Sequence, residues 1–542
     1  MTTELDIPRP ENEPALDYAP GSAEREELLK KLEEIKGLAA DIPLMIGGKE
    51  VRAEKTSPII IPHDNKRTLG LFHKAGAAEV QLAIDAANAA RAGWARTPWR
   101  ERAAIFQKAA ELLAGPWRST LVAATMLGQS KTPHQAETDA ACELADHYRF
   151  NSYYLNQLYA QQPPSPAGEK NSLEYRPMEG FILALTPFNF TAIAGNLPAA
   201  PALMGNTVIW KPAPGAILSG YYLMKLWQAA GLPDGVINMV PGPGGEVGAH
   251  AIDSPDLAGV NFTGTTPVFN SIWTSIARNL YKYKDYPRIV GETGGKGFIF
   301  AHSSCDPEAL KTAILRGAYE YQGQKCSAAS RAYIPRSLWN GIKDELISQI
   351  NGIKMGPCED FSCFMNAVID KTAYDSIKGY LSLVKSSADA KILAGGGCDE
   401  TRGYFIKPTL IETSNPQFKT MCEEIFGPVM TVFVYEDARF GETLKICDET
   451  SPYALTGAVF ARDKDAIREA SDRLADAAGN FYINDKPTGA MVDRQPFGGG
   501  RSSGTNDKVG WHHNLLRWAS ARTIKENLAP PTDYRYPYML EK

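Results

Sequence analysis

The chain has 542 residues, with 57 Lys and Arg against 62 Asp and Glu, which gives a formal net charge of −5. This balance leaves no basic excess, so we exclude nucleic acid as the main partner. Because 44% of the residues are hydrophobic and 10% are aromatic, the chain can bury large cores and is not expected to be disordered.

Cysteine usage argues against a disulfide scaffold and against a metal site. The eight cysteines form no Cys-x-x-Cys pair, and the one close pair, Cys358 and Cys363, has no histidine near it in the sequence. No apolar run approaches the ~20 residues that a membrane helix needs. We therefore expect a soluble protein of a reducing compartment, the cytoplasm or, for a processed chain, the mitochondrial matrix.

The first elements are an extended arm and a set of helices. Residues 1–21 are acidic and interrupted by prolines, so an extended arm is predicted. Leu28, Leu32 and Ile35 recur at helical spacing and predict a helix from Ala23 to Gly37. Further helices are predicted near 78–93, 99–114, 118–127 and 136–159. Residues 161–180 are polar and proline-containing, and they predict a projecting hairpin.

From residue 181 onward, short apolar strands alternate with helices, which is typical of parallel α/β sheets. The first series has strands at 181–186, 207–210, 235–240, 259–264, 288–292 and 298–300, with helices near 216–230 and 267–282. The second runs from a helix near 307–321 to a strand at 479–484, with helices near 337–350, 371–387 and 464–476 and strands at 327–334, 405–412, 429–435 and 458–461. The chain is therefore predicted to hold two α/β units.

Three glycine-rich segments were considered as sites. GPGGEVG at 242–248 lacks the last glycine of the dinucleotide fingerprint and is predicted to be an ordinary turn. GGKG at 294–297 lacks the other residues of a phosphate-binding loop. GRSSG at 500–504 resembles a hydrolase elbow but follows no strand. None of them predicts a site by itself.

Two residues have the surroundings of reactive groups. Cys326 lies in the polar segment QGQKCS, and the neighbouring Lys325 would favour its thiolate form. Glu292 directly follows the apolar segment RIVG, where solvation explains a carboxylate poorly. From these residues alone, catalysis and simple packing both stay open for Cys326.

Five separated segments resemble the aldehyde dehydrogenase superfamily: 186–190, 262–265, 291–296, 323–328 and 423–428. The strings at 188–206, 320–328, 478–490 and 495–508 are similar to its Δ1-pyrroline-5-carboxylate dehydrogenase branch in particular. The resemblance runs from about residue 40 to the C-terminus. It implies an α/β fold of the aldehyde dehydrogenase type, with a Rossmann-like NAD-binding domain, an α/β catalytic domain and a projecting β-hairpin for oligomerisation.

The resemblance also implies domain boundaries. These are an arm at 1–21, an NAD-binding domain at 22–160 and 181–291, a catalytic domain at 292–485, a substrate anchor loop with the return to the NAD-binding domain at 486–514, and an oligomerisation flap with the C-terminal tail at 161–180 and 515–542. In the family the flap joins the C-terminal strand across a dimer interface, so an isologous homodimer or a higher oligomer is expected.

The activity that the resemblance implies is NAD-dependent oxidation of L-glutamate γ-semialdehyde, in equilibrium with Δ1-pyrroline-5-carboxylate, to L-glutamate. This is the second step of proline catabolism. Cys326 would form a thiohemiacetal and then a thioester. The side-chain amide of Asn189 and the backbone N–H of Cys326 would stabilise the oxyanion, and Glu292 would activate the hydrolytic water.

Binding residues are implied in the same way. Those for NAD are Lys211 at the adenosine ribose, Thr265 at the pyrophosphate, Glu424 and Phe426 at the nicotinamide ribose and ring, and Phe188 beside them. Those for the substrate are Ser327, Gly489 and Ala490 for its α-carboxylate, Glu137 for its α-ammonium group, and Phe190 and Phe497 as walls of the aldehyde pocket. Pro214 stands where many NAD-preferring relatives have an acid, so use of NADP stays open.

Three other functions are alternatives to this activity. The chain could oxidise a different, uncharged aldehyde. It could be a non-catalytic NAD-binding or structural protein, although the presence of Asn189, Glu292 and Cys326 together argues against that. It could be a thiol acyltransferase, although Lys211, Thr265 and Glu424 would then have no purpose.

Overall fold

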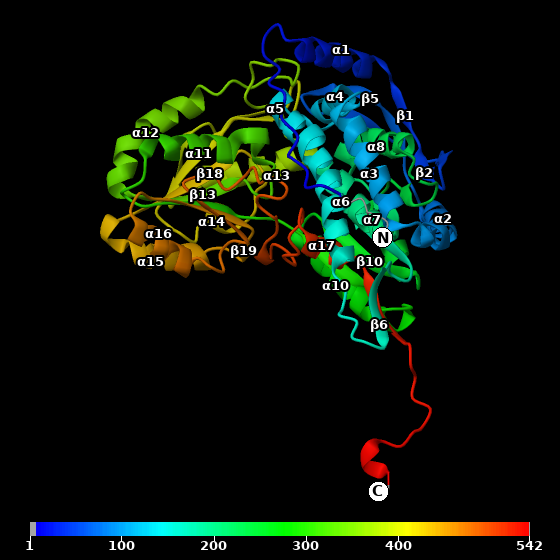
Figure 1. Ribbon diagram of the computed structural model, residues 1–542. Coiled ribbons are helices and arrows are strands. Elements are labelled where there is room, and N and C mark those ends of the chain that lie inside the picture. The colour runs from blue at the N-terminus through cyan, green and yellow to red at the C-terminus, as the bar shows by residue number, and fades with distance from the viewer. Residues whose placement is uncertain (1–6, 541–542) are drawn as a thin grey trace.

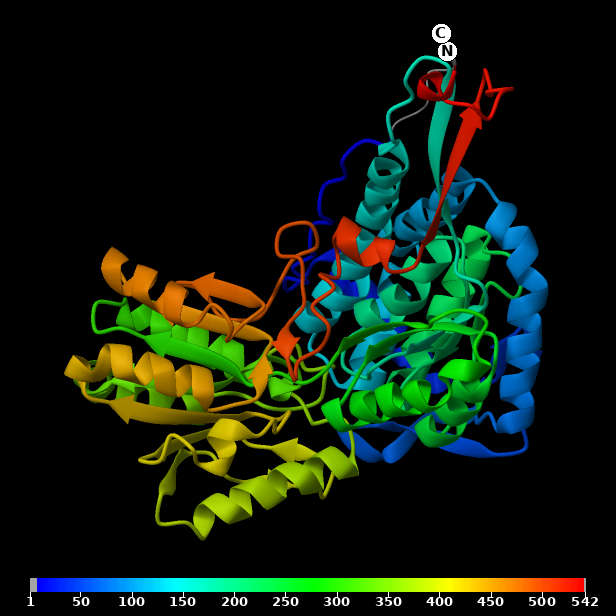
Figure 2. The same cartoon turned by 90° about the horizontal axis from the view of Figure 1, so that it is seen from below.

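The computed structural model describes residues 7–540 and has two α/β bodies that lie side by side, with a two-stranded ribbon projecting from one of them (Figures 1 and 2). Each body is built around a seven-stranded sheet. The two α/β units predicted from the alternation of strands and helices are therefore found, but the strand at 298–300, predicted at the end of the first series, belongs to the second sheet.

The first sheet has the order β11-β10-β7-β8-β9-β2-β3. Its strands are β2 (Leu44–Ile46), β3 (Lys49–Val51), β7 (Phe181–Leu185), β8 (Thr207–Lys211), β9 (Ile237–Met239), β10 (Leu257–Thr263) and β11 (Arg288–Glu292). The five strands from β11 to β9 run parallel. Ile182 and Ala184 of β7 enter one core, whereas Leu183 and Leu185 enter another, so the sheet is buried on both faces.

Helices cover both faces of this sheet. They are α1 (Ala23–Gly37), α2 (Ala77–Arg96), α3 (Trp99–Ala114), α4 (Arg118–Gln129), α5 (Pro133–Ala136), a π-helix (Glu137–Glu143), α6 (Leu144–Ala160), α7 (Thr191–Leu203), α8 (Ile217–Ala230), α9 (Gly244–Asp253) and α10 (Thr266–Arg278). The predicted turn at 242–248 is wrong, because α9 begins at Gly244 directly after Pro243. A further sheet of β1 (Ala40–Ile42), β5 (Asp64–His73) and β4 (Thr56–Ile61) was not predicted.

The second sheet has the order β14-β17-β18-β13-β12-β20-β21. Its strands are β12 (Gly297–Ala301), β13 (Ala329–Pro335), β14 (Ala390–Ala394), β17 (Thr409–Thr413), β18 (Val429–Tyr435), β20 (Thr456–Phe460) and β21 (Asn480–Ile483). Its helices are α11 (Pro307–Tyr319), α12 (Arg336–Asn351), α13 (Lys371–Lys385), α14 (Lys419–Cys422), α15 (Phe440–Glu449) and α16 (Lys464–Arg473), with α17 (His512–Leu516) on the return to the first body. Phe298 and Ile299 of β12 enter different cores, so this sheet is also covered on both faces.

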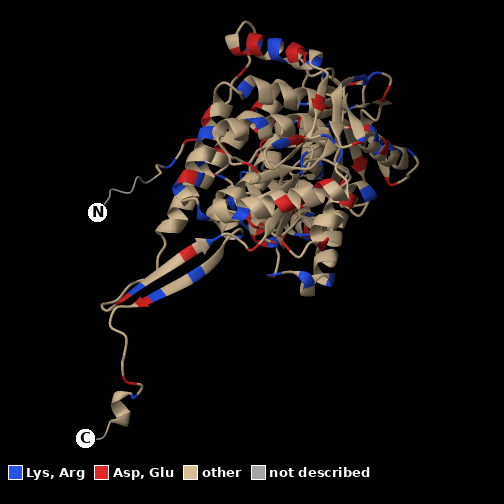
Figure 3. Ribbon diagram, turned by 90° about the vertical axis from the view of Figure 1, so that its right-hand side faces the viewer, with Lys and Arg blue, Asp and Glu red and all other residues tan. Residues whose placement is uncertain are grey.

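The projecting ribbon differs from the predicted hairpin. Residues 161–180 supply one strand, β6 (Glu169–Arg176), and its antiparallel partner is β23 (Ser520–Asn527) of the same chain. The strands carry charged pairs such as Lys525 with Glu169, and charges line the ribbon in Figure 3. The pairing of these two segments is therefore intramolecular, not made across an interface between subunits.

Residues 7–19 contain no helix or strand and run along the surface of α5 and α6 (Figure 1). Among the residues that the structure describes, no helix is both long and apolar enough to span a membrane.

Candidate active site

The residues predicted for the cofactor and for catalysis gather at one edge of the first sheet. Lys211 ends β8, Glu292 ends β11, Thr265 lies two residues after β10, and Phe188 and Asn189 follow β7. The strand order reverses between β7 and β10, because β8 and β9 lie on one side and β10 and β11 on the other. Ligands bind at the carboxyl ends of parallel strands at such a switch point.

The second sheet faces this position with the edge at which its parallel strands β12 and β13 begin. Cys326 lies just before β13, and Gly295 just before β12. The amide nitrogen of Asn189 donates to the carbonyl of Gln324 at 3.1 Å, which joins the two edges. A Cβ atom on Gly295 would lie 2.2 Å from the carbonyl oxygen of Cys326, so only glycine fits there.

The loop before Cys326 has an unusual backbone. Tyr321, Gln322 and Gly323 all have positive φ angles of 51 to 65°. The Gln322 side chain holds this shape, since it donates to the carbonyls of Ser130 at 3.0 Å and Ala367 at 2.8 Å. Left-handed residues in succession persist only where the surroundings fix them, and they are common at functional sites.

The Cys326 thiol is buried, with 8% of the residue exposed. Burial, together with the negative charges of Glu292 and Glu424, raises its pKa well above the ordinary value. Lys325 does not oppose this effect, because its ammonium group pairs with Glu320 at 3.1 Å. The expectation that Lys325 favours the thiolate is therefore wrong, and the thiol of the free protein is protonated at neutral pH.

Glu292 is a buried carboxylate with an unsatisfied oxygen. Its Oε1 atom has no hydrogen-bond partner among the described residues, and burial raises the pKa of Glu292 to about 8. It lines a small cavity with Phe497, Asn261 and Gly498. A buried carboxyl group left without a partner is costly, which makes it a candidate for a functional base or acid.

Glu424 bridges the two edges from the segment between α14 and β18. Its carboxylate accepts from the backbone N–H of Gly295 at 2.8 Å and from that of Phe426 at 3.2 Å. Phe426 has a φ of 57° and lies edge-on to Phe188, with 5.9 Å between the ring centroids. The structure therefore brings Glu424, Phe426 and Phe188 together near Cys326.

The donors suited to a dinucleotide lie farther along the same edge. Lys211 forms no ion pair with any described residue, and burial lowers its pKa to about 8. Gly244 is the first residue of α9, and a Cβ atom added to it would lie 3.9 Å from the Lys211 ammonium nitrogen. Thr265 precedes the first residue of α10. Two helix N-termini with a cation fit a pyrophosphate-containing cofactor such as NAD.

The predicted carboxylate-binding residues also come together. The hydroxyl of Ser327 donates to that of Thr488 at 2.9 Å, and Gly489 and Ala490 follow Thr488. Gly489 is exposed and has a φ of 92°. The backbone N–H groups of this loop therefore lie beside the residue that follows Cys326.

Phe190 is held by a buried lysine. The Lys131 ammonium lies 4.0 Å from the centre of the Phe190 ring and 4.4 Å from that of Tyr321, and it pairs with Asp139 at 2.7 Å. Asp139 also accepts from the backbone N–H groups of Thr191 and Ala192, so it fixes the start of α7. Burial raises the pKa of Asp139 and lowers that of Lys131, but these hydrogen bonds favour the ionised pair.

Glu137 does not lie with these residues. Its side chain is fully buried, and its oxygens accept from Arg118 at 3.0 Å, from the Leu16 backbone at 2.9 Å and from the Tyr18 hydroxyl at 2.7 Å. This arrangement contradicts the prediction that Glu137 pairs with a substrate ammonium group.

A second carboxylate of this segment, Glu143, lies at the other end of the π-helix, with its Oε1 atom 3.8 Å from Nε2 of His147. The pKa values of Cys326 and Glu292 are raised mainly by burial, and the charge of Glu143 adds to both effects. The Glu143 side chain is 28% exposed. The sequence analysis missed it, because the segment offers two glutamates and nothing in the sequence marks the π-helix between them.

Cys358 has a histidine neighbour that the sequence did not predict. Its sulfur lies 3.9 Å from Nε2 of His63, and that nitrogen is 3.0 Å from the Glu359 carboxylate. These three residues have the donor types of a metal site. However, the Lys36 ammonium lies 2.8 Å from the same carboxylate and already provides a cation. The cluster is explained as a buried ion-paired contact.

Comparison with known proteins agrees with this geometry. The model of the aldehyde dehydrogenase family matches residues 50–524. The chain is 52% identical over 538 residues to the mitochondrial delta-1-pyrroline-5-carboxylate dehydrogenase of Dictyostelium discoideum, covering 99% of this chain and 96% of that protein. It is 49% identical over 529 residues to that of Bos taurus, covering 97% and 94%.

Solved structures agree as well. The Mycobacterium tuberculosis delta-pyrroline-5-carboxylate dehydrogenase bound with NAD superposes with a TM-score of 0.96 at 48% identity, covering 100% of both chains. The Thermus 1-pyrroline-5-carboxylate dehydrogenase with bound NAD has a TM-score of 0.89 at 30% identity, covering 97% of this chain and 100% of that one. From its sequence segments, its two facing sheets and these matches, the chain belongs to the aldehyde dehydrogenase family.

Proposed function

We propose that this protein oxidises L-glutamate γ-semialdehyde, in equilibrium with Δ1-pyrroline-5-carboxylate, to L-glutamate with NAD. The observation that carries the proposal is the position of the Cys326 thiol at the junction of the two sheets, near the Asn189 amide and the unpartnered Glu292 carboxylate. The names of the similar proteins support the same substrate.

Cys326 acts as the nucleophile. Its sulfur attacks the aldehyde carbon and makes it tetrahedral, and the carbonyl oxygen becomes an oxyanion. One N–H of the Asn189 amide is used by the Gln324 carbonyl at 3.1 Å, which fixes the side chain and leaves the second N–H for the oxyanion. Such a donor contributes about 3–4 kcal/mol to the stabilisation of the transition state.

The burial of the thiol sets a requirement for this step. Because the pKa of Cys326 is raised, its proton must be removed when the substrate is in place. Glu292 is the candidate acceptor, since its carboxylate also contributes to the raised pKa of the thiol and its pKa of about 8 suits proton transfer near neutral pH.

The residues at the carboxyl edge of the first sheet fit NAD, which, when bound, supplies the two-electron acceptor for the oxidation. Lys211 and the N-termini of α9 and α10 suit the adenosine ribose and the pyrophosphate, and Glu424 suits the second ribose. Pro214 starts a 3-10 turn after Lys211 and offers no carboxylate, so the ratio of NAD to NADP use has to be measured.

Glu292 then serves hydrolysis of the Cys326 thioester. Once the proton taken from the thiol has been released to solvent, the ionised carboxylate accepts a proton from the attacking water and passes it to the departing sulfur, which restores the thiol. The pKa of about 8 predicts that this step becomes faster as the pH rises toward that value. One carboxyl group thus serves both proton transfers.

The substrate is an amino acid that carries an ammonium group and a carboxylate on its α-carbon. Ser327 and the backbone N–H groups of Gly489 and Ala490 suit its carboxylate, and Glu143 replaces Glu137 as the partner of its ammonium group. Phe190 and Phe497 suit the aliphatic part. Charged contacts on both sides give specificity over uncharged aldehydes.

We further infer a homodimer or a higher homo-oligomer, because the β6·β23 ribbon projects from the body and an isolated two-stranded ribbon is only marginally stable. All eight cysteines are free thiols, which supports a reducing compartment, the cytoplasm or the mitochondrial matrix.

The test is NADH formation from Δ1-pyrroline-5-carboxylate compared with short aliphatic aldehydes. We expect clear preference for the first, loss of turnover in Cys326→Ala, and full activity in Cys363→Ala, a buried thiol outside the site. Mass spectrometry during turnover should find an acyl adduct on Cys326. Undiminished turnover in Cys326→Ala, or equal rates with uncharged aldehydes, would refute the proposal.

A further inference from the structure

The N-terminal arm lies against both segments that carry the proposed contacts to the substrate's charged groups. Glu13 donates its backbone N–H to Asp146 of α6 at 2.7 Å, close to the π-helix. Asn12 donates to Asp146 at 2.8 Å and to the carbonyl of Val492 at 3.0 Å. Val492 lies two residues after Ala490, so the arm joins the π-helix region to the substrate anchor loop.

The Glu13 side chain ties the arm to two arginines. One oxygen accepts from Arg118 at 2.6 Å, and the other accepts from Arg149 at 2.7 Å. Burial opposes ionisation of Glu13, but the hydrogen bonds from both arginines outweigh it and lower its pKa. Two charge-assisted bonds in a partly buried position favour one position of the arm.

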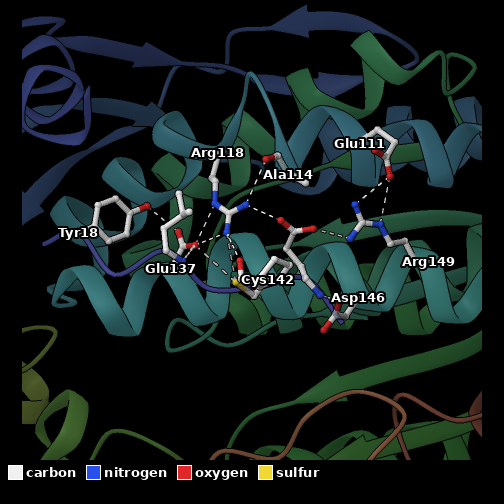
Figure 4. A network of polar contacts seen from close by, with 11 residues as sticks. Tyr18, Glu111, Ala114, Arg118, Glu137, Cys142, Asp146 and Arg149 are labelled. Atoms are coloured by element: carbon white, nitrogen blue, oxygen red, sulfur yellow. Dashed lines mark hydrogen bonds and ion pairs between the residues drawn. The ribbon is translucent and has the colours of Figure 1, made fainter. Parts of the chain in front are cut away.

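The next part of the arm holds the first residue of the π-helix. Glu137 accepts from the backbone N–H of Leu16 and from the hydroxyl of Tyr18, and it also pairs with Arg118. Figure 4 shows the Tyr18 hydroxyl and the Arg118 guanidinium pointing at the Glu137 carboxylate from different sides. Tyr18 is itself buried, with 5% exposed. The start of the π-helix is therefore fixed by the arm.

The other end of the same π-helix is Glu143, the proposed partner of the ammonium group. A π-helix is a rare local structure that is often found at functional sites. Contacts at its first residue therefore help to decide where its last residue lies, six positions farther along the chain.

The anchor loop is fastened to the arm by side chains of both. Arg9 of the arm pairs with Asp493, which has a φ of 70°, and Arg494 donates to Asn12 at 3.0 Å. The loop residues Gly489 and Ala490 precede these contacts by three to five positions. Because the loop contains no helix or strand between 486 and 499, these contacts restrict its motion.

We propose that the arm, residues 7–21, is a positioning strap that holds Glu143 and the anchor loop at the separation required by a substrate bearing both an ammonium group and a carboxylate. The proposal rests on the proposed function. The arm residues touch no reacting atom, so they act through Glu143, Gly489 and Ala490. Loss of the strap should weaken binding of the charged substrate and leave the chemistry at Cys326 unchanged.

The experiment compares two arm variants with a matched control. Asn12→Ala removes the side-chain bonds to Asp146 and to the Val492 carbonyl, and Glu13→Gln removes the charge that pairs with Arg118 and Arg149. Asp17→Asn makes the same charge change as Glu13→Gln at an exposed position of the same arm. Both variants should still fold, because Arg118 still forms its ion pair with Glu137, and Arg149 still forms its ion pair with Glu111 at 2.9 Å. If only a tenth of the molecules keep the competent arrangement, KM rises about tenfold.

We expect KM for Δ1-pyrroline-5-carboxylate to rise about tenfold in both arm variants, with kcat unchanged and with kinetics for a short aliphatic aldehyde unchanged. Asp17→Asn should match the wild type. Failure of the wild type to oxidise Δ1-pyrroline-5-carboxylate would refute the proposed function instead. An active wild type with arm variants like Asp17→Asn, or a loss of thermal stability without a rise in KM, would overturn the strap.

Discussion

Replacing Glu292 by Gln should stabilise the protein and abolish its turnover. The Glu292 carboxyl is buried with an unpartnered oxygen, and burial raises its pKa from 4.5 to about 8. A group with a raised pKa in the folded state contributes stability below its unfolded pKa, and this contribution is lost as the pH rises through the folded pKa. The difference of 8 − 4.5, about 3.5 pKa units, corresponds to at most ~5 kcal/mol.

Gln has the same shape as Glu and carries no charge at any pH. The difference in stability between Glu292→Gln and the wild type should therefore be smallest near pH 4 and largest above about pH 8, in favour of the variant. The charge of Lys508 lowers the pKa of Glu292 below what burial alone would give, and the limit of ~5 kcal/mol already includes this effect. Thermal and guanidinium midpoints measured across this pH range test the expectation.

Activity should change in the opposite direction. Without a base for the thioester step, steady-state turnover should fall by about 10²–10⁴-fold. If the proton of the thiol can leave by another route, one equivalent of NADH per active site appears in a burst, and acyl-enzyme accumulates. Glu33→Gln, at an exposed position of α1, is the control.

Two results would refute this reasoning. If the stabilities of Glu292→Gln and the wild type differ by the same amount at every pH, then Glu292 does not bear the electrostatic cost of burial. If the steady-state rate of the variant is that of the wild type, another group activates the water.

The remaining predictions concern other parts of the site. Asn189→Ala should lower kcat by about 10²–10³-fold, measured at saturating substrate, and a smaller effect would argue against an oxyanion role. Glu143→Gln should raise KM for Δ1-pyrroline-5-carboxylate and not for short aliphatic aldehydes, and an equal rise for both would remove Glu143 from substrate recognition. Lys131→Met should cost about 3–5 kcal/mol in unfolding free energy, because it leaves Asp139 buried without its cation. Loss of less than ~1 kcal/mol in denaturant unfolding would show that the pair is not ionised.

The sequence was sufficient for features that depend on local pattern. The helix from Ala23 to Gly37, the strand that ends in Glu292 and the strand that follows Cys326 can be predicted from the pattern of apolar residues. Because the carboxyl ends of parallel strands share an edge, the alternation of strands and helices also explains why Lys211 and Glu292 lie at the same edge of the first sheet. Resemblance to the family supplied the roles proposed for them.

Contacts between distant segments could not be predicted in this way. Lys325 is next to Cys326 in the sequence, yet its ammonium group pairs with Glu320, so the thiol keeps a raised pKa. The partner of β6 lies about 350 positions away in β23, and the histidine near Cys358 is His63. Side-chain direction and long-range pairing depend on packing, which sequence spacing does not contain.

Glu137 and Glu143 show most clearly what the sequence determined and what only the tertiary structure decided. The sequence by itself determined that this segment is helical and carries several carboxylates, and its resemblance to the family implied that one of them faces the substrate. Only the tertiary structure decided which glutamate is free for that role: the arm and Arg118 occupy Glu137, whereas Glu143, at the other end of the π-helix, adds its charge to the raised pKa values of Cys326 and Glu292. The physical reason is that a buried carboxylate accepts hydrogen bonds from whichever donors the fold places next to it.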